Sequence, residues 1–324
     1  MCGERGSNVP EWMASSLHFE WCMFEELVSW GPNECPHCPS LGSSQKGVLR
    51  KGYYWRSSDR RRIPRFHCQR CNRSFSVGTF DPCFRQKKRT LNSSLGSLLC
   101  SCVSQRRLAL LLGINRKTVV RKFIFLGIQA FQSQLGRLEE RSLSGNPVSE
   151  VYFDEMESFE HSKCLPLSIP IAVEARTRKI LAFQVCSMPS KGPLARISVR
   201  KYGHRPDHRS YAARSVLEQV GVLLAPGSQI KTDENPKYPR WIQSSLPRSL
   251  LHRSYLGKRG CIVGQQELKK VGFDPLFDLN HTCAMIRANI NRLVRKTWCT
   301  TKKRERLFLH LALYAEFHNE VLVG

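Results

Sequence analysis

Residues 151–159 are VYFDEMESF, residues 167–174 are LSIPIAVE, and residues 179–187 are KILAFQVCS. Each run is rich in apolar and β-branched side chains, and short polar segments separate them, one of them at residues 176–178. This pattern predicts three successive strands joined by short turns, because apolar runs of this length between turn signals are typical of buried strands.

The chain on the carboxyl side of these strands alternates between helix and strand patterns. The predicted elements are a helix over 210–224, a strand over 228–232, a helix over 238–245, a strand over 249–255, and two closing helices over 277–296 and 302–318. Three antiparallel strands followed by helix, strand and helices is the element order of an RNase H-like fold. We therefore expect a mixed sheet flanked by helices over residues 148–324, within a multidomain α/β protein.

Two aspartates stand at notable places in these predicted strands. Asp154 lies within an apolar strand, where a charge is costly unless it binds a cation or a partner, and Asp233 ends the strand over 228–232. The first and fourth strands of an RNase H-like sheet are neighbours, so the two carboxylates would face each other. Such oxygen ligands suit Mg²⁺ or Mn²⁺, and paired metals promote phosphodiester chemistry. Alternatively, Asp154 forms a salt bridge and Asp233 belongs to a turn.

Cys35, Cys38, Cys68 and Cys71 form two CxxC pairs with the spacing of a four-thiolate zinc site. The residues between the pairs fit a β-hairpin, and basic and aromatic side chains are interleaved along it. The pattern predicts a zinc ribbon over residues 31–85 that contacts DNA or RNA through arginines such as Arg60, Arg61 and Arg62. The alternative is a ribbon that packs only on a neighbouring domain.

Residues 104–121, SQRRLALLLGINRKTVVR, fit a helix-turn-helix. The apolar core positions are Leu108, Leu112, Ile114 and Val119. Gly113 suits the turn, and Asn115 can cap the second helix. The side chains left to face a DNA groove or phosphates are Arg116, Lys117, Thr118, Arg121 and Lys122. We expect residues 86–147 to hold this module and a polar linker over 135–147; a plain structural hairpin is the alternative.

The composition favours a polyanionic partner. Lys and Arg number 51 against 26 Asp and Glu, a formal charge of +25, and neutralised phosphates release condensed counterions. The charge is spread along the chain, which argues against a membrane surface, and the sequence contains no long apolar run. Apart from the CxxC pairs, the cysteines are scattered singly, as free thiols of a reducing compartment would be. Residues 1–30 suggest an amphipathic extension.

This combination of a CxxC ribbon, a helix-turn-helix and an Asp…Asp RNase H-like domain resembles the DDE transposases of short bacterial insertion sequences. Residues 287–298, RANINRLVRKTW, resemble the closing helices of the insertion-sequence-one group. The resemblance covers about residues 31–318. It implies binding to the double-stranded ends of the element, metal-dependent strand cleavage and joining to target DNA, a homo-oligomer, and a place in the bacterial cytoplasm on the nucleoid.

The sequence departs from this family at the third acid. The resemblance places that position at Asn280, seven residues before Arg287, which would contact a phosphate of the element end. An amide oxygen ligates a hard cation but brings no charge. Three explanations are open. This branch of the family uses Asp-Asp-Asn, or the third ligand is Asp278 or Asp274, or this protein is catalytically inactive. Glu267 is a weaker candidate.

Three other functions fit the same patterns. They are a non-catalytic DNA-binding regulator, a structure-selective nuclease of the same fold, and an RNA-binding zinc protein. His252 could contact the scissile phosphate, although a lone histidine is more often structural. The basic loop at residues 201–209 is read as a contact with the DNA backbone, with a solvated surface as the alternative.

Overall fold

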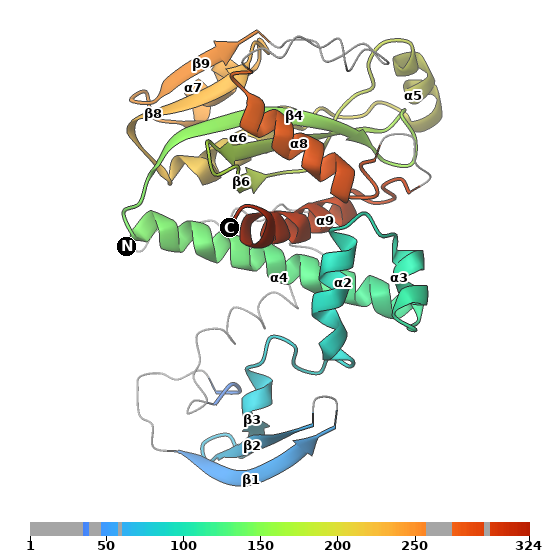
Figure 1. Cartoon of the computed structure of the whole chain (residues 1–324), viewed down its shortest axis with the longest axis vertical. Helices are drawn as coiled ribbons and strands as arrows, with labels where there is room; N and C mark the ends of the chain where they lie inside the picture. Colours follow the sequence, from blue (N-terminus) through green and yellow to red (C-terminus); the bar gives the residue numbers. More distant parts are fainter. Residues whose placement is uncertain (1–34, 39–46, 58–59, 257–273, 295–298) are drawn as a thin grey trace. The chain divides into compact units, whose positions relative to one another are not determined.

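The computed structural model describes residues 35–38, 47–57, 60–256, 274–294 and 299–324. The chain divides into two compact units, Met1–Ser93 and Ser94–Gly324, and Figure 1 shows their helices and strands. The helix expected within residues 1–30 lies outside the described residues. The four-segment division of the chain stays a prediction.

The first unit contains a small antiparallel sheet. Its strands are β1 (Val48–Arg56), β2 (Arg61–Cys68) and β3 (Arg73–Ser76), in the order β1-β2-β3. Short 3₁₀ turns follow at Val77–Thr79 (η1) and Arg89–Leu91 (η2). The hairpin expected between the cysteine pairs is therefore present. Phe75 is buried beside Cys35 and Cys68, and the guanidinium groups of Arg56 and Arg89 both pair with the Asp81 carboxylate.

The second unit begins with helices α2 (Asn92–Leu99), α3 (Gln105–Leu111) and α4 (Arg116–Leu143). The predicted start of α4 is confirmed: the Asn115 side chain accepts a hydrogen bond from the Lys117 amide at 2.8 Å. Gly113, with φ of +59°, forms the turn between α3 and α4, in the left-handed region that favours glycine.

The linker expected over residues 135–147 is wrong, because α4 continues to Leu143. Helix α4 packs on α9 (Arg304–Phe317) so closely that a Cβ at Gly127 would lie 2.8 Å from the Leu309 carbonyl oxygen. At its far end, the Arg141 guanidinium donates to both carboxylate oxygens of Glu174, at 2.6 and 3.1 Å. Tertiary contacts therefore extend a helix that its polar sequence would end.

The rest of the second unit is a mixed sheet flanked by helices, as expected. The strands are β4 (Val148–Phe159), β5 (Pro166–Glu174), β6 (Ile180–Phe183), β7 (Cys186–Ser187), β8 (Leu224–Asp233) and β9 (Leu251–Tyr255). Their order is β6-β5-β4-β8-β9, with β7 also paired to β5. Strands β4 to β6 run antiparallel, whereas β8 is parallel to both β4 and β9.

The third predicted strand is divided into β6 and β7. Between them, the Gln184 amide donates to the Pro170 carbonyl on β5, but Pro170 has no N–H to return the bond. The Gln184 side chain instead accepts from the Val185 amide at 3.0 Å. A proline in the partner strand therefore interrupts the ladder.

Helices cover both faces of the sheet (Figure 1). They are α5 (Leu194–Tyr202), α6 (Arg209–Gly221), α7 (Tyr238–Ser245), α8 (Phe277–Asn289) and α9, which ends in a π-helical turn at His318–Leu322. Val151 and Phe153 of β4 pack with α6 and α7, and Phe183 contacts Phe308 of α9 on the other side. No helix in the described part of the chain is long and apolar enough to cross a membrane.

Candidate functional site

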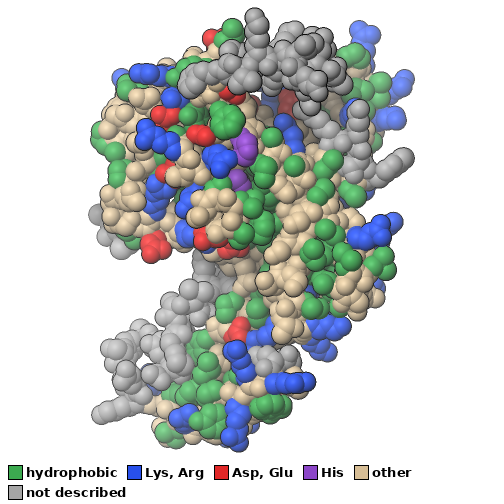
Figure 2. Space-filling model, in the orientation of Figure 1, with side chains coloured by type: hydrophobic (Ala, Val, Ile, Leu, Met, Phe, Trp, Pro, Cys, Tyr) green, Lys and Arg blue, Asp and Glu red, His purple; other side chains and the backbone are tan. Residues whose placement is uncertain are grey.

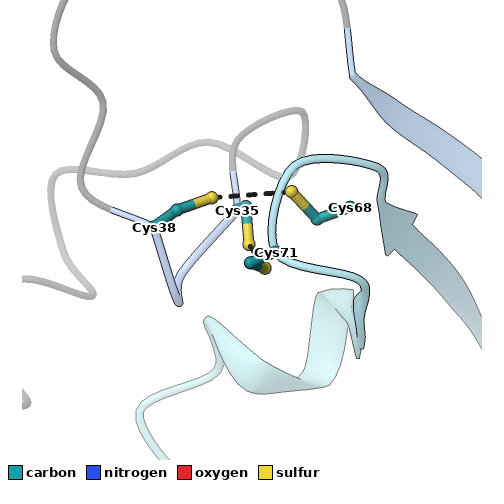
Figure 3. Close-up of side chains that lie close together, drawn as sticks. All are labelled: Cys35, Cys38, Cys68 and Cys71. Carbon is teal, nitrogen blue, oxygen red and sulfur yellow. Dashed lines mark hydrogen bonds between the residues drawn. The ribbon is translucent and has the colours of Figure 1, made fainter.

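The sulfur atoms of Cys35, Cys38, Cys68 and Cys71 converge at one point of the first unit (Figure 3). All four lie within 4.8 Å of one another, with Cys35–Cys71 and Cys38–Cys68 separations of 3.5 Å. Among the described residues, this is the one group of three or more Asp, Glu, His or Cys side chains that converges in this way. Four thiolates so close together can hold a tetrahedral metal ion.

The pKa values of Cys38 and Cys68 shift in opposite directions. Burial raises the pKa of Cys38 to about 12, helped by its thiol neighbours. Burial also opposes ionisation of Cys68, but hydrogen bonds from the Cys71 and Arg70 amides and from neighbouring thiols outweigh it and lower its pKa to about 7. A cation bound among the sulfurs would favour the thiolate form of every ligand, so binding would release protons.

The hairpin beside this cluster presents a basic surface. Arg60, Arg61 and Arg62 are all exposed at the turn end of the hairpin. Exposed aromatic side chains lie among these arginines, and Figure 2 shows basic and hydrophobic side chains interleaved over this unit. The arginines of this surface match the negative charges of a polyanion, and its aromatic side chains match exposed flat rings such as bases.

The start of α4 presents a second basic surface. Arg116, Lys117 and Arg121 are exposed there, and Thr118 is partly exposed. The expectation that Lys122 also faces outward is wrong, since only 3% of its surface is exposed. Lys122 follows the buried Val119 by three residues, so both lie on the helix face that packs inward.

The sheet places Asp154 and Asp233 side by side. The parallel register pairs Tyr152 on β4 with Lys231 on β8, and each aspartate follows its strand's residue by two positions. Because side chains alternate between the faces of a sheet, both carboxylates lie on the same face. The position is the carboxyl end of β8, where β4 continues beyond its neighbour.

A residue that the sequence did not indicate, Tyr238, holds this pair in place. Its hydroxyl donates to Asp154 Oδ1 at 2.9 Å and accepts from the Glu155 amide at 3.1 Å. The Glu155 amide also donates to Asp154 Oδ1, at 2.7 Å, so the amide, the hydroxyl and the carboxylate form one hydrogen-bonded group. Asp233 is held in turn by the Asn235 amide, 3.1 Å from its Oδ1. In the sequence, the only indication that Tyr238 contacts the carboxylates is its place just after the turn that follows Asp233.

The environment of Asp154 opposes its negative charge. Burial raises the pKa of Asp154 to about 6, and the nearby charge of Asp233 adds to this effect against hydrogen bonds from the Glu155 amide and Tyr238. Burial and the same carboxylates raise the pKa of Tyr238 well above its usual value, so its hydroxyl remains a donor. A buried carboxyl group whose pKa is raised beside a second carboxylate is a donor set that a divalent cation would stabilise.

Helix α8 packs beneath this pair, with Cys283 close enough to Asp154 for the carboxylate charge to raise its pKa, after burial as the main cause. Asn280, one turn earlier, is exposed, and its amide nitrogen donates to Asp274 Oδ2 at 2.9 Å. Asp278 accepts instead from the Arg176 amide at 2.8 Å.

Neither Asp274 nor Asp278 therefore completes a convergent acidic group with Asp154 and Asp233 among the described residues, and the side chain of Asn280 is bonded to Asp274. Arg287 lies two helical turns after Asn280 and is partly exposed. Glu267 lies outside the described residues.

Of the two interpretations of His252, the structure favours the structural one. His252 is paired in register with Ile230, and its Nε2 lies 2.9 Å from the hydroxyl of the fully buried Thr232. Thr232 precedes Asp233 directly, so its side chain lies on the opposite face of the sheet. The partly exposed histidine therefore lies on the face of the sheet that carries Ile230, opposite the two aspartates.

The loop at residues 201–209 is less available to DNA than its sequence suggests. Arg205 pairs with Glu160 at 3.5 Å, and Arg209 pairs with Asp207 at 2.6 Å. Carboxylates within the protein thus offset part of its positive charge.

No protein-family model matches this chain, and no curated protein matches it in sequence. Its function is therefore inferred from the residues and their geometry: a mixed α/β unit with a carboxylate pair, and a unit with a four-cysteine cluster and a basic hairpin.

Proposed function

We propose that this protein is a transposase of the DDE class, with an RNase H-like catalytic domain, that binds the ends of its own element and cleaves and joins DNA strands. The observation that carries the proposal is the register of β4 and β8, which pairs Tyr152 with Lys231; Asp154 and Asp233 each follow by two residues and so lie on one face of the sheet. The strand order β6-β5-β4-β8-β9, antiparallel then parallel, supports the RNase H-like assignment.

The residues present fit divalent cations. The raised pKa of Asp154 reflects burial and an adjacent carboxylate, and a cation would relieve both effects. Bound Mg²⁺ or Mn²⁺ would supply an activated water or 3′-hydroxyl and stabilise the leaving oxygen of the phosphodiester. Asp154 and Asp233 would hold the ions, and Tyr238 would fix the orientation of the Asp154 carboxylate.

Other residues would anchor the DNA. We assign a structural zinc ion to the four cysteines, because four convergent thiolates are the ligands zinc prefers. Arg60, Arg61 and Arg62 of the hairpin would contact the phosphates of the element end. Arg116, Lys117, Thr118 and Arg121 at the start of α4 would read or anchor the duplex as a helix-turn-helix does, and Arg287 would contact a phosphate near the carboxylates. Pairing of two element ends favours a homo-oligomer.

The test is cleavage of duplex DNA that carries the sequences flanking the coding region, in Mg²⁺. We expect Asp154→Asn and Asp233→Asn each to abolish nicking and strand transfer while binding to the duplex persists. Glu157→Gln, an exposed change on the same strand β4, is the matched control and should leave cleavage intact. Full cleavage by Asp154→Asn would refute the catalytic assignment. Equal cleavage of scrambled ends or branched DNA would instead identify a structure-selective nuclease.

The hydrogen bonding of Asn280 on α8 favours a second function. Asn280 bonds to Asp274, and no third acid joins the pair in the described residues, as expected of a DNA-binding regulator derived from a transposase. The Asn280→Glu variant separates the two cases. It should raise Mg²⁺-dependent cleavage if the site is only weakened, and leave it absent if the protein solely binds DNA.

A further inference from the structure

The β1–β2 hairpin has an aromatic face that its own unit leaves open. The antiparallel register pairs Tyr53 with Pro64 and Trp55 with Arg62, so these side chains lie on one face of the hairpin. The exposed fractions are 51% for Tyr53 and 61% for Trp55. Large aromatic side chains with more than half of their surface open on a strand are unusual in a protein that does not use them for binding.

The first unit forms its own core elsewhere. Near the cysteines, the Phe75 ring packs on Phe66 and Phe80, with centroids 5.6 and 5.8 Å apart. On the opposite face of the hairpin, Ile63 is buried and Tyr54 approaches Gly78. Tyr53 and Trp55 therefore contribute little to the folding of this unit.

Two arginines frame the Tyr53 ring. The guanidinium carbon of Arg50 lies 5.0 Å from the ring centroid and that of Arg62 lies 6.0 Å away. The Arg50 guanidinium also donates to the Tyr53 hydroxyl. These contacts hold the ring in place beside positive charges that remain open to an anion. We refer to Arg50, Tyr53, Trp55 and Arg62 together as the aromatic–arginine face.

The charge of the hairpin selects the partner. Its sequence between Gly47 and Cys68 carries one acidic residue, Asp59, against a larger basic set, Arg50, Lys51, Arg56, Arg60, Arg61, Arg62 and Arg65. A polyanion that also offers flat rings satisfies both features of this surface. Bases inside a duplex stack on one another and cannot offer their faces to a side chain, whereas unpaired bases can.

We propose that the aromatic–arginine face binds unpaired bases of nucleic acid, with a base stacked on Trp55, the Tyr53 ring beside it held by the two arginines, and the adjoining phosphates bound by Arg50 and Arg62. The proposal deepens the proposed function and rests on it only in placing nucleic acid on this hairpin. Strand cleavage exposes single-stranded ends, which such a face would hold. Single-stranded RNA offers the same chemistry.

The experiment measures binding of the full-length, zinc-loaded protein to fluorescein-labelled dT12, rU12 and a 12-base-pair duplex by anisotropy at fixed salt. Stacking is worth about 1–3 kcal/mol per base, so Trp55→Ala should weaken dT12 binding by roughly fivefold to a hundredfold. Trp55→Phe should retain most of the affinity because it keeps an aromatic ring. Duplex binding should change by less than about threefold, because duplex affinity comes mainly from phosphate contacts.

Leu49→Ala is the matched control. Leu49 lies on the same strand, is 51% exposed and pairs with His67, which places it on the other face of the hairpin. This variant should bind dT12 as the wild type does. Zinc content and circular dichroism of every variant establish that the unit is folded.

Unchanged dT12 binding by Trp55→Ala, or an equal loss for dT12 and the duplex, would overturn the proposal. A change in oligomeric state on sedimentation with dT12 binding intact would also overturn it and assign the face to a protein contact. The rU12 arm distinguishes the source of the bases, since a preference for RNA would support base stacking but place an RNA on the face. The two proposals can fail separately. If Trp55→Ala loses dT12 binding but the wild-type protein cleaves no DNA, base stacking on this face is supported and the transposase function is rejected.

Discussion

Asp154→Asn should stabilise the metal-free protein at neutral pH even as it removes catalysis. In the folded protein, burial and Asp233 raise the pKa of the Asp154 carboxyl from 3.8 to about 6. A carboxyl whose pKa is raised by folding binds its proton more tightly in the native state, so stability falls as pH rises from about 4 to about 6. The shift corresponds to about 3 kcal/mol, and this full penalty is present at pH 7.

The side-chain amide that Asp154→Asn introduces carries no charge, and its oxygen can still accept from Tyr238, so the variant should avoid this penalty. Urea unfolding followed by circular dichroism, without magnesium or manganese, should place the variant above wild type by up to about 3 kcal/mol at pH 7. The difference should shrink towards zero near pH 4. Added Mg²⁺ should stabilise the wild type and leave the variant unchanged, because a ligand stabilises only the state that binds it.

The matched control is Glu157→Gln, whose side chain lies exposed on the same strand and pairs with Lys191. It should alter stability by less than about 0.5 kcal/mol at every pH. An Asp154→Asn variant that is less stable than wild type at pH 7, or offset by a constant amount from pH 4 to 7, would refute the account of a buried, charge-strained carboxylate.

Other variants test the contacts that build the two units. Tyr238→Phe removes the donor to Asp154, so urea unfolding should show a loss of about 1–3 kcal/mol and calorimetric titration should show weaker Mg²⁺ binding. Unchanged stability together with unchanged Mg²⁺ binding would contradict the positioning role of Tyr238. Cys68→Ser should bind no zinc, as measured by plasma mass spectrometry, and the sheet of the first unit should unfold, because structural zinc supplies on the order of 10 kcal/mol to small modules. Zinc retained by the variant would refute the four-cysteine site. Arg141→Ala breaks the paired hydrogen bonds to Glu174 and should lower stability by about 1–3 kcal/mol; an unchanged urea midpoint would show that the end of α4 is not bound to the sheet.

The sequence predicted those elements whose apolar pattern is strong. Helix α7 has the bounds expected from its sequence, and β4 and β5 differ from expectation by a few residues at most. Helix α7 has helical periodicity, and β4 and β5 are apolar runs between turn signals, so local pattern and tertiary packing favour the same conformation.

The errors occurred where tertiary contacts outweighed local pattern. Residues 135–143 are polar and resemble a linker, but α4 gains its last turns from packing on α9 and from the Arg141 contact to Glu174. Lys122 was assigned to a surface by residue type, whereas its position on the helix directs it inward. Residue type indicates which chemistry is available, and periodicity decides the direction in which it points.

The sequence by itself determined which chemical groups are available in the two units. These are the cysteines with their CxxC spacing, the arginines interleaved with aromatic residues along the hairpin, and an aspartate in each of two apolar strands. Local pattern carries this information because strand alternation and CxxC spacing are short-range properties. Only the tertiary structure decided that β4 and β8 run side by side, in the register that pairs Tyr152 with Lys231 two residues before the aspartates, and that the Tyr238 hydroxyl donates to Asp154. Register and long-range contacts depend on how distant segments bury their surfaces together, and no short stretch of sequence contains that information.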